Sequence, residues 1–477
     1  MAPVGVDEWV ARSGDKREQA TGLRGILVRI SERVGWWPRL ALLAIGGFVF
    51  AQLGINVNEQ TVAFNSVIYA ILAVGLNITV GWAGLLDLGY VAFFGVGAYG
   101  YALFSSHAFG TLALSTGGIH LPVIATIPIV LVAAGILGVL IGLVALRLEG
   151  DYLAIVTLFV GTAFVEAVNN IAPTTLGGNN GLFGLDPFHA FGGRISSVRG
   201  YYYLGLIMLI VLMAALRLLE HSRTGRAWRA LRDDPLAAEV MTVPVNALKV
   251  MAFSFGAIVA ALAGTLFAGE QDSVFPPDFQ SIILITIYAC LVLGGVGGIA
   301  GAVLGGVTVT VAEALLSSPT DSSYLFYGLI LLAVIARVRP WRHMIMVVGA
   351  IVGLGLAARA IVGAISHSAV SGSAGTVGWI GRVMHHYVIV PSGPASLTYG
   401  KIMYAILICA LILIVQLKGV WRLVAVVPTV YVAACCWESL LIVESGTTAV
   451  VMLGAILVVM MAARPHGLLG QRKVEVV

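Results

Sequence analysis

The stretch from Leu121 to Leu146, LPVIATIPIVLVAAGILGVLIGLVAL, contains no charged side chain. A helix of about 20 apolar residues crosses the hydrocarbon core of a bilayer, so this stretch is long enough to span a membrane. Similar apolar runs recur along the chain, separated by short polar connections. We therefore predict an all-α fold, a polytopic bundle of transmembrane helices.

The composition supports the same class. Of the 477 residues, 59% are hydrophobic and 10% are charged, and the mean hydropathy is +0.98. Soluble domains carry about 25% charged residues, with which they cover their surface. These values exclude a soluble enzyme, a secreted disulfide-rich scaffold and a disordered regulator. The net charge of +4 does not indicate nucleic-acid binding, because the basic residues cluster in short loops and in the tail.

Hydropathy predicts about 14 spanning helices. They lie near 39–56, 61–82, 86–106, 121–146, 152–171, 200–219, 250–269, 279–297, 299–316, 324–338, 343–365, 400–417, 419–441 and 447–463. If the N-terminus is inside, alternation of the spans places the arginine-rich connections on the cytoplasmic side. The opposite loops 55–60 and 270–278 carry acidic residues and no Lys or Arg. The alternation of the spans and the positive-inside distribution of Lys and Arg assign each of these loops to the same side of the membrane. Both termini are therefore predicted to be cytoplasmic.

The chain divides into four predicted regions. Residues 1–38 form a cytoplasmic tail with an amphipathic interfacial helix, which the apolar face Leu23, Ile26, Leu27, Ile30 and Val34 indicates. Residues 39–340 form the core, including a cytoplasmic connection at 220–249. Residues 341–450 are additional transmembrane helices, and 451–477 are the last helix and a cytoplasmic C-terminal tail. A weak repeat between 313–340 and 438–465 is consistent with an insertion or partial duplication at 341–450; chance similarity between apolar helices is the alternative.

The connection 220–249 carries the signals of a short cytoplasmic helix. Asp234 precedes Pro235, which gives an N-cap carboxylate and a proline at the first helical position. Pro244 ends the helix, because a residue before proline avoids helical angles. We expect a helix over 235–243 after an arginine-rich arm. Such a helix can sit in a cleft of another protein and pass its movement into the membrane; an ordinary positively charged loop with an incidental helical turn is the alternative.

Polar side chains inside apolar runs are candidates for a translocation path, because a charge or amide in lipid is costly and tends to face a cavity. The candidates are Asn77, Asp87, Tyr90, Glu166, Asn169 and Asn170, with Asn179 and Asn180 in an adjoining loop. The alternative for each is a hydrogen bond between helices without substrate contact. This alternative is strongest for Asp87, which is predicted to lie near the cytoplasmic surface.

Several motifs, in one order, resemble the permease subunit of branched-chain amino acid ABC importers, of the LivM type. The matching stretches are 75–99 (GLNITVGWAGLLDLGYVAFFGVGAY), 148–158 (LEGDYLAIVTL), 176–182 (LGGNNGL), 225–249, the glycine-rich 294–306 and 464–470 (RPHGLLG). The resemblance covers about 60–340 and the C-terminal signature. The chain differs from the family at 341–450. In a usual member, the C-terminal signature follows directly after the helix that corresponds to 324–338.

The resemblance implies a permease that forms the translocation path for branched-chain amino acids by alternating access. The implied partners are two ABC ATPase subunits, a second LivH-type permease, an extracytoplasmic substrate-binding protein and the lipid of a bacterial or archaeal plasma (inner) membrane. The residues expected to couple to the ATPases are Arg226, Arg229, Arg232, Asp234, Pro235, Ala237, Ala238 and Glu239. The sequence has no G-x-x-x-x-G-K-[ST] phosphate loop, so ATP would be used by the partners. No catalytic residue, metal or cofactor is expected in this chain.

Three alternatives stay open on the sequence. A urea or short-amide permease of the same family would carry similar motifs. An ATP-independent secondary transporter would need a charge network at the midplane, for which Glu166 and Glu313 are few, and it would leave 225–249 without a role. An integral-membrane enzyme would need His or carboxylate side chains at ligand spacing, and the adjacent His385 and His386 have no carboxylate near them in the sequence.

Overall fold

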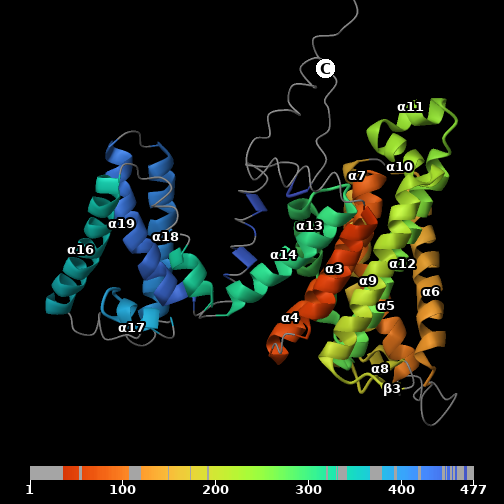
Figure 1. Ribbon diagram of the computed structural model, residues 1–477, viewed down its shortest axis with the longest axis horizontal. Coiled ribbons are helices and arrows are strands. Elements are labelled where there is room, and N and C mark those ends of the chain that lie inside the picture. The colour runs from red at the N-terminus through yellow and green to blue at the C-terminus, as the bar shows by residue number, and fades with distance from the viewer. Residues whose placement is uncertain are drawn as a thin grey trace, which may run out of the picture. The chain divides into compact units, whose positions relative to one another are not determined.

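The computed structural model describes residues 36–52, 56–106, 120–148, 150–171, 173–190, 193–318, 321–328, 330, 341–365, 376, 379–391, 395–416, 420–442 and single positions between 446 and 469. The chain divides into two compact units, Met1–Leu284 and Ile285–Val477 (Figure 1). The predicted interfacial helix before Trp36 lies outside the described residues, as do most of the predicted spans at 324–338 and 447–463 and the end of the C-terminal tail.

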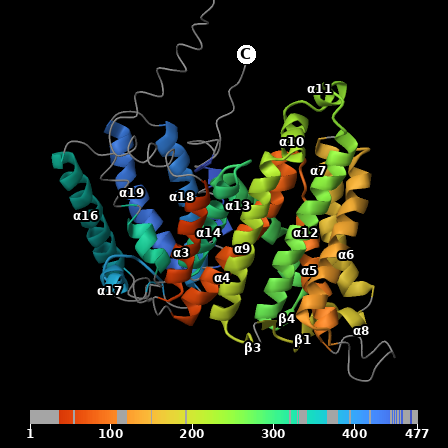
Figure 2. The same ribbon diagram turned by 45° about the vertical axis from the view of Figure 1, so that its right-hand side comes forward.

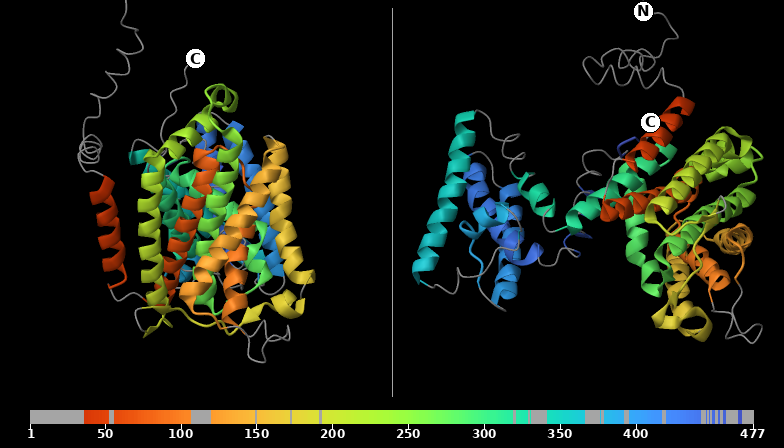
Figure 3. Two further views of the ribbon diagram at one scale, coloured as in Figure 1. Left: turned by 90° about the vertical axis from the view of Figure 1, so that its right-hand side faces the viewer. Right: turned by 60° about the horizontal axis from the view of Figure 1, so that its bottom comes forward.

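Long helices make up the first unit. They are α3 (Trp36–Phe50), α4 (Val57–Leu76) with its π-helical continuation η1 (Asn77–Trp82), α5 (Tyr90–Ser105), α6 (Val123–Ala145), α7 (Asp151–Asn170), α9 (Val198–His221) and α12 (Val245–Gln271). At one end of this unit, two short helices, α10 (Arg223–Asp233) and α11 (Pro235–Val240), join α9 to α12 (Figure 2). Figure 3 shows the long helices of this unit running side by side between its two ends.

The opposite end of the unit is closed by short elements. These are α8 (Pro173–Leu176), η3 (Gly178–Asn180) and η4 (Pro276–Phe279), with two small antiparallel sheets. One sheet pairs β1 (Leu182–Phe183) with β4 (Ser273–Val274), and the other pairs β2 (His189–Ala190) with β3 (Gly193–Arg194). These strands are two residues long each, so the architecture remains helical.

Helix α12 is the centre of the unit and packs against α4, α5 and α6. Glycines allow its backbone to approach that of α5. A Cβ atom at Gly264 would lie 2.1 Å from the Phe94 carbonyl oxygen, and one at Gly97 would lie 2.2 Å from the Ala261 carbonyl oxygen. Where lipid surrounds the helices, association depends on such close packing, because lipid tails are as apolar as the side chains that they meet.

Replacing Gly264 with leucine is expected to prevent correct folding. The new side chain would meet backbone, which cannot move aside as a side chain can, and overpacking a tight contact costs about 1–3 kcal/mol or more. Fluorescence-detected size-exclusion chromatography should show the loss of the monodisperse peak. Gly46→Leu is the matched control, since a Cβ atom there meets nothing within 4 Å; an unchanged peak for Gly264→Leu would contradict the packing described.

Seven helices in the described part of the chain are long and apolar enough to cross a membrane. They are Val57–Trp82, Val123–Ala145, Asp151–Asn170, Val198–His221, Val245–Gln271, Pro276–Gly294 and Ile299–Ser317. Shorter apolar helices cover Tyr90–Ser105, Gly349–Ala364, Thr398–Ile414 and Ala425–Leu441. The predicted class, an all-α polytopic membrane protein, is therefore confirmed. The helix predicted over 86–106 begins later, at Tyr90, because residues 83–89 form an irregular connection in which Gly84 has a φ of 73°.

The second unit contains α14 (Ile299–Ser317), α16 (Trp341–Ile365), α17 (Trp379–His385), α18 (Ala395–Gln416), α19 (Val420–Cys436) and the π-helical η6 (Trp437–Leu441). It also contains most of α13 (Ser281–Gly294). The C-terminal signature returns to the end of α13. The backbone N–H of Leu468 donates to the Leu293 carbonyl at 2.9 Å, and that of Leu469 donates to the Gly294 carbonyl at 3.0 Å. Two of the motifs that carry the family resemblance are thus in direct contact.

A buried carboxylate holds part of the second unit together. Glu438 in η6 accepts hydrogen bonds from the Tyr327 hydroxyl at 2.7 Å and from the Thr376 backbone N–H at 2.9 Å and hydroxyl at 2.6 Å. The neighbouring Trp437 donates its indole N–H to Ser323 at 3.1 Å. Because a buried charge needs such partners, these contacts fix η6 against the segments that contain residues 323–327 and 376.

Candidate functional site: coupling segment and translocation path

The connection between α9 and α12 is helical over most of its length. The Ser222 side chain accepts a hydrogen bond from the Gly225 N–H at 3.2 Å and caps α10, which is the arginine-rich arm of the sequence. Asp234 then caps α11 through hydrogen bonds from the N–H groups of Leu236 at 2.9 Å and Ala237 at 3.0 Å. The Asp234 cap and Pro235 at the first helical position are both as the sequence predicts. The helix ends at Val240, earlier than the predicted residue 243.

The three arginines of α10 make different contacts. Arg226 donates to the His221 carbonyl at 2.7 Å, and Arg229 donates to the Glu220 carbonyl at 3.0 Å. Both cations therefore bind the C-terminal end of α9, where the helix dipole favours positive charge. Arg232 is partly buried and donates instead to the carbonyl of Gly81 in η1. The three arginines were predicted, with five other residues, to couple to the ATPases. The contacts described here lie within the chain, and the coupling role stays a prediction.

The outer face of α11 is apolar and exposed. Leu236, Val240 and Met241 are 75%, 82% and 75% exposed. Of the predicted coupling residues, Asp234, Pro235, Ala237 and Glu239 are also exposed, whereas Ala238 is 4% exposed and faces the rest of the chain. Large apolar side chains at the polar end of a membrane protein are typical of a protein-docking surface. The sequence analysis did not single out Leu236 and Val240, although their spacing of one helical turn places them on one face.

Three of the predicted path residues lie between the start of η1 and the start of α5. Asn77 lies in η1, Asp87 in the connection before α5, and Tyr90 at the first position of α5, and all three are buried within the chain. Asp87 accepts a hydrogen bond from the Gly89 N–H at 3.0 Å. Gly75 leaves the room that the Tyr90 hydroxyl occupies, since a Cβ atom there would lie 2.1 Å from it. In this conformation the three side chains are enclosed by protein and do not line an open surface.

Burial raises the pKa of Asp87 to about 7, and the Gly89 N–H opposes this shift. The folded state then binds the proton more tightly than the unfolded state does, so stability should fall as the pH rises from about 4 to about 7. Thermal melts of the detergent-solubilised protein should show this slope, and Asp87→Asn should reduce it. The control is Asp151→Asn, at an exposed position that begins α7. A slope of unchanged size in Asp87→Asn would assign it to other groups.

A second set of predicted residues lies on the outer face of α7. The Asn170 amide donates to the Glu166 carboxylate at 2.9 Å, one helical turn away, and both residues are exposed. They line a shallow groove together with Phe159, Thr162, Ala163, Ala167 and Ile171. Asn169 has a buried side-chain oxygen without a hydrogen-bond partner among the residues that the structure describes, and Asn179 and Asn180 are exposed in η3. The structure therefore exposes Glu166 and Asn170, whereas it buries Asn77, Asp87 and Tyr90.

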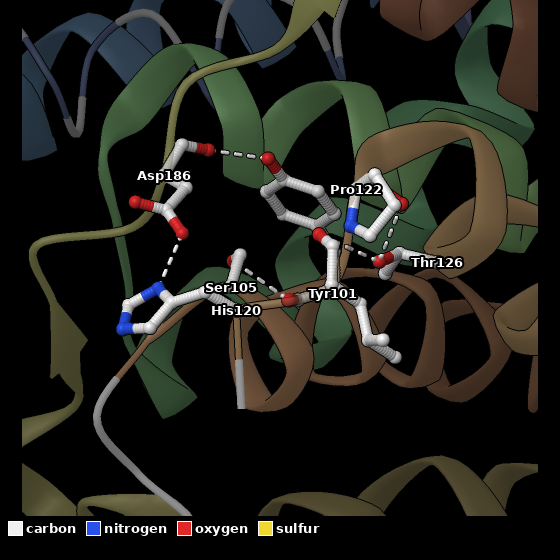
Figure 4. A network of polar contacts seen from close by, with 7 residues as sticks. Tyr101, Ser105, His120, Pro122, Thr126 and Asp186 are labelled. Carbon is white, nitrogen blue, oxygen red and sulfur yellow. Dashed lines mark hydrogen bonds and ion pairs between the residues drawn. The ribbon is translucent and has the colours of Figure 1, made fainter. Parts of the chain in front are cut away.

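The end of the unit opposite α10 and α11 is tied by a network that the sequence analysis missed (Figure 4). The Tyr101 hydroxyl donates to the Asp186 carbonyl, and His120 pairs with the Asp186 carboxylate, with 2.5 Å between Nδ1 and Oδ2. The Ser105 hydroxyl donates to the Tyr101 carbonyl at 2.7 Å. These contacts join the end of α5, the residues before α6 and the loop before β2. The residues that bind Asp186 are 66 and 85 positions away from it in the sequence, so no local sequence pattern predicts these two contacts.

Comparison with known proteins places the chain in a family. The family model described as "Branched-chain amino acid transport system / permease component" matches residues 60–335. The chain is 34% identical over 291 residues to the "High-affinity branched-chain amino acid transport system permease protein LivM" of Escherichia coli (strain K12), covering 56% of this chain and 65% of that protein. It is also 34% identical over 330 residues to the LivM protein of Salmonella typhimurium, covering 61% of this chain and 75% of that relative.

Identity to the LivH protein of Escherichia coli (strain K12) is 24% over 273 residues, 54% of this chain and 84% of that protein. No solved structure matches the chain. The match to the Escherichia coli LivM protein spans just under two thirds of that protein. The family model covers more than half of the chain and includes α4 to α14. The resemblance seen in the sequence is confirmed: the chain belongs to the family of branched-chain amino acid transport system permease components.

Proposed function

We propose that this chain is the membrane permease subunit of an ATP-driven importer and forms the translocation path for branched-chain amino acids by alternating access. The observation that carries the proposal is the pair α10 and α11 between the spanning helices α9 and α12, with Leu236 and Val240 exposed on the outer face of α11. A carrier that needs no ATPase has no use for an exposed apolar helix at this position. The names of the relatives, which are branched-chain amino acid permease proteins, support the substrate class.

In this proposal, ATP is bound and hydrolysed by two separate ABC ATPase subunits that dock on α11. The chain itself holds no nucleotide, cofactor or metal and is a transport subunit, not an enzyme. A LivH-type permease completes the membrane part, and an extracytoplasmic protein delivers the substrate. The assembly lies in a bacterial or archaeal plasma membrane. About 14 spans with both termini in the cytoplasm place α10 and α11 on the ATPase side.

The face of α7 that carries Glu166 and Asn170 is the proposed wall of the path. A carboxylate within a spanning helix is costly in lipid and tends to face the bundle interior or a water-filled cavity. This tendency favours a neighbour other than lipid for this face. A water-filled path shared with the second permease supplies that neighbour. Glu166 can then bind the α-ammonium group of an amino acid, while apolar side chains such as Phe159 contact its aliphatic part.

Affinity purification of the chain from its native membrane tests the assembly. Mass spectrometry should identify two ATPase subunits with phosphate loops and a second permease in the purified complex. Calorimetry on the associated binding protein should then show a preference for leucine, isoleucine or valine over urea and short amides. Recovery of the chain alone, able to move solute in liposomes without ATP, would contradict the proposal and favour a secondary transporter.

A further inference from the structure

The inner face of α10 is attached to η1 by an aromatic pair. Trp228 is fully buried, and its ring stacks on that of Trp82, the last residue of η1, with 6.2 Å between centroids and 28° between planes. The indole N–H of Trp228 donates to the Leu248 carbonyl at 2.9 Å and so fixes the ring to the start of α12. Trp228 thus connects the short cytoplasmic helix with two spanning helices.

Arg232, one turn further along α10, makes the second attachment. Its guanidinium donates to the Gly81 carbonyl in η1. Gly84 lies under the same side chain, since a Cβ atom there would be 3.0 Å from the Arg232 Cγ atom. The φ of 73° at Gly84 is one that residues with a Cβ atom rarely adopt. The connection after η1 therefore bends around Arg232 and depends on it for a charge-assisted hydrogen bond.

From η1 the contacts continue to α7. The backbone N–H of Leu88 donates to the Thr157 hydroxyl at 3.0 Å, and Gly89 lies against the Thr157 carbonyl, from which a Cβ atom would be 2.5 Å away. Glu166 lies about 13 Å further along α7, at a helical rise of about 1.5 Å per residue. A continuous series of packed and hydrogen-bonded groups thus runs from α10 through η1 and residues 83–89 to the helix that carries Glu166.

The π-helical form of η1 suits an element that changes conformation. A π-turn has poorer packing than an α-helical turn, and such turns occur frequently at functional sites. Here the π-pattern extends beyond Trp82, because the Ala83 N–H donates to the Ile78 carbonyl at 3.1 Å. The Leu85 N–H donates to the Thr79 carbonyl at 2.9 Å. Displacement of Gly81 or Trp82 would therefore move the connection that contacts α7.

We propose that η1 and residues 83–89 transmit the movement of α10 and α11 to α7, and that Trp228 and Arg232 are positioning residues for this transmission. Arg232 then acts inside the permease and does not bind an ATPase. The inference rests on the proposed function in one respect, namely that ATPases move α11. The attachment of α10 to η1 is a property of this chain and can be measured without them.

Hydrogen exchange of the full chain in lipid nanodiscs tests the attachment. Arg232→Gln should make the amides of residues 81–89 exchange at least about tenfold faster, because a hydrogen bond from a charged donor is lost. Arg232→Lys, which keeps a cationic donor, should restore much of the protection. Arg223→Gln is the matched control: it removes the same charge at an exposed position at the other end of α10 and should leave residues 81–89 unchanged. Unchanged exchange in Arg232→Gln would overturn the inference.

Transport by the complete complex separates the two roles of Arg232. Arg232→Gln should retain the ATPase subunits on purification and retain ATP hydrolysis, while substrate uptake falls about tenfold as hydrolysis and transport become uncoupled. Loss of the ATPase subunits from this variant would make Arg232 a docking residue and overturn the inference. Uptake by the wild-type chain without ATP would instead refute the proposed function, and the exchange measurement would still decide whether α10 holds η1.

Discussion

Replacing Leu236 and Val240 together with glutamate is expected to release the ATPase subunits and abolish ATP-dependent uptake. Both side chains are exposed on the outer face of α11, one helical turn apart. Each is a candidate anchor in an apolar cleft of the partner, and truncation of an interface anchor costs about 2 kcal/mol or more. Two buried, unpaired carboxylates cost more still, so an affinity loss of about a thousandfold is expected.

Co-purification and uptake in proteoliposomes measure this effect, and conservative variants provide the control. Leu236→Met with Val240→Leu keeps an apolar face of similar size and should keep the ATPases bound. Ala238 is less suitable for this test, because it faces the rest of the chain and a larger side chain there would displace α11. ATPase binding that survives the double glutamate variant would show that the docking surface lies elsewhere on the chain.

Replacing Glu166 with glutamine is expected to reduce uptake by about tenfold to a hundredfold while the complex stays assembled. Glutamine is close to isosteric and can still accept the hydrogen bond from Asn170, so the local structure should persist. The variant lacks the negative charge that would bind a substrate ammonium group, and a charged hydrogen bond contributes about 1.5–3 kcal/mol. Uptake of labelled leucine over a range of concentrations should show the loss.

The control for this variant is Asp321→Asn, which removes an exposed carboxylate from the second unit and should leave uptake unchanged. A rise in KM would place Glu166 in substrate binding, and a lower maximal rate would place it in a later step of the cycle. Normal uptake in Glu166→Gln would remove Glu166 from the path and leave the Asn170 contact as a hydrogen bond within α7.

Much of the fold could be predicted from hydropathy, because each spanning helix satisfies its own backbone groups and needs only an apolar run of sufficient length. The π-helical η1 could not be predicted in this way. Its residues Asn77–Trp82 continue the apolar run of α4, and the change in helical form occurs where η1 makes tertiary contacts such as the stacking of Trp82 on Trp228.

Only part of the candidate site could be predicted from the sequence, because the directions of its side chains depend on tertiary contacts. An N-cap signal is local, so Asp234 and Pro235 marked the start of α11 directly. Which way a side chain points is set by partners that are distant in the sequence. Arg232 turns toward Gly81 and Ala238 toward the chain, while Leu236 and Val240 face outward.

For the polar residues within apolar runs, the sequence likewise does not show whether a side chain is buried or exposed. Hydropathy marks Asp87 and Glu166 equally as costly groups in a membrane. The structure encloses Asp87 within one unit and places Glu166 on an outer face. Only the packing of the helices distinguishes a group that is buried within the chain from one that is exposed on its surface.

The most direct test of the central claim is the uptake of labelled leucine by proteoliposomes that contain this chain with its co-purified permease and ATPases. The binding protein is supplied on the outside, and ATP or a non-hydrolysable analogue is enclosed within. We expect uptake with ATP and none with the analogue or without the ATPases. Equal uptake by this chain alone, without ATP, would contradict its assignment as the permease subunit of an ATP-driven importer.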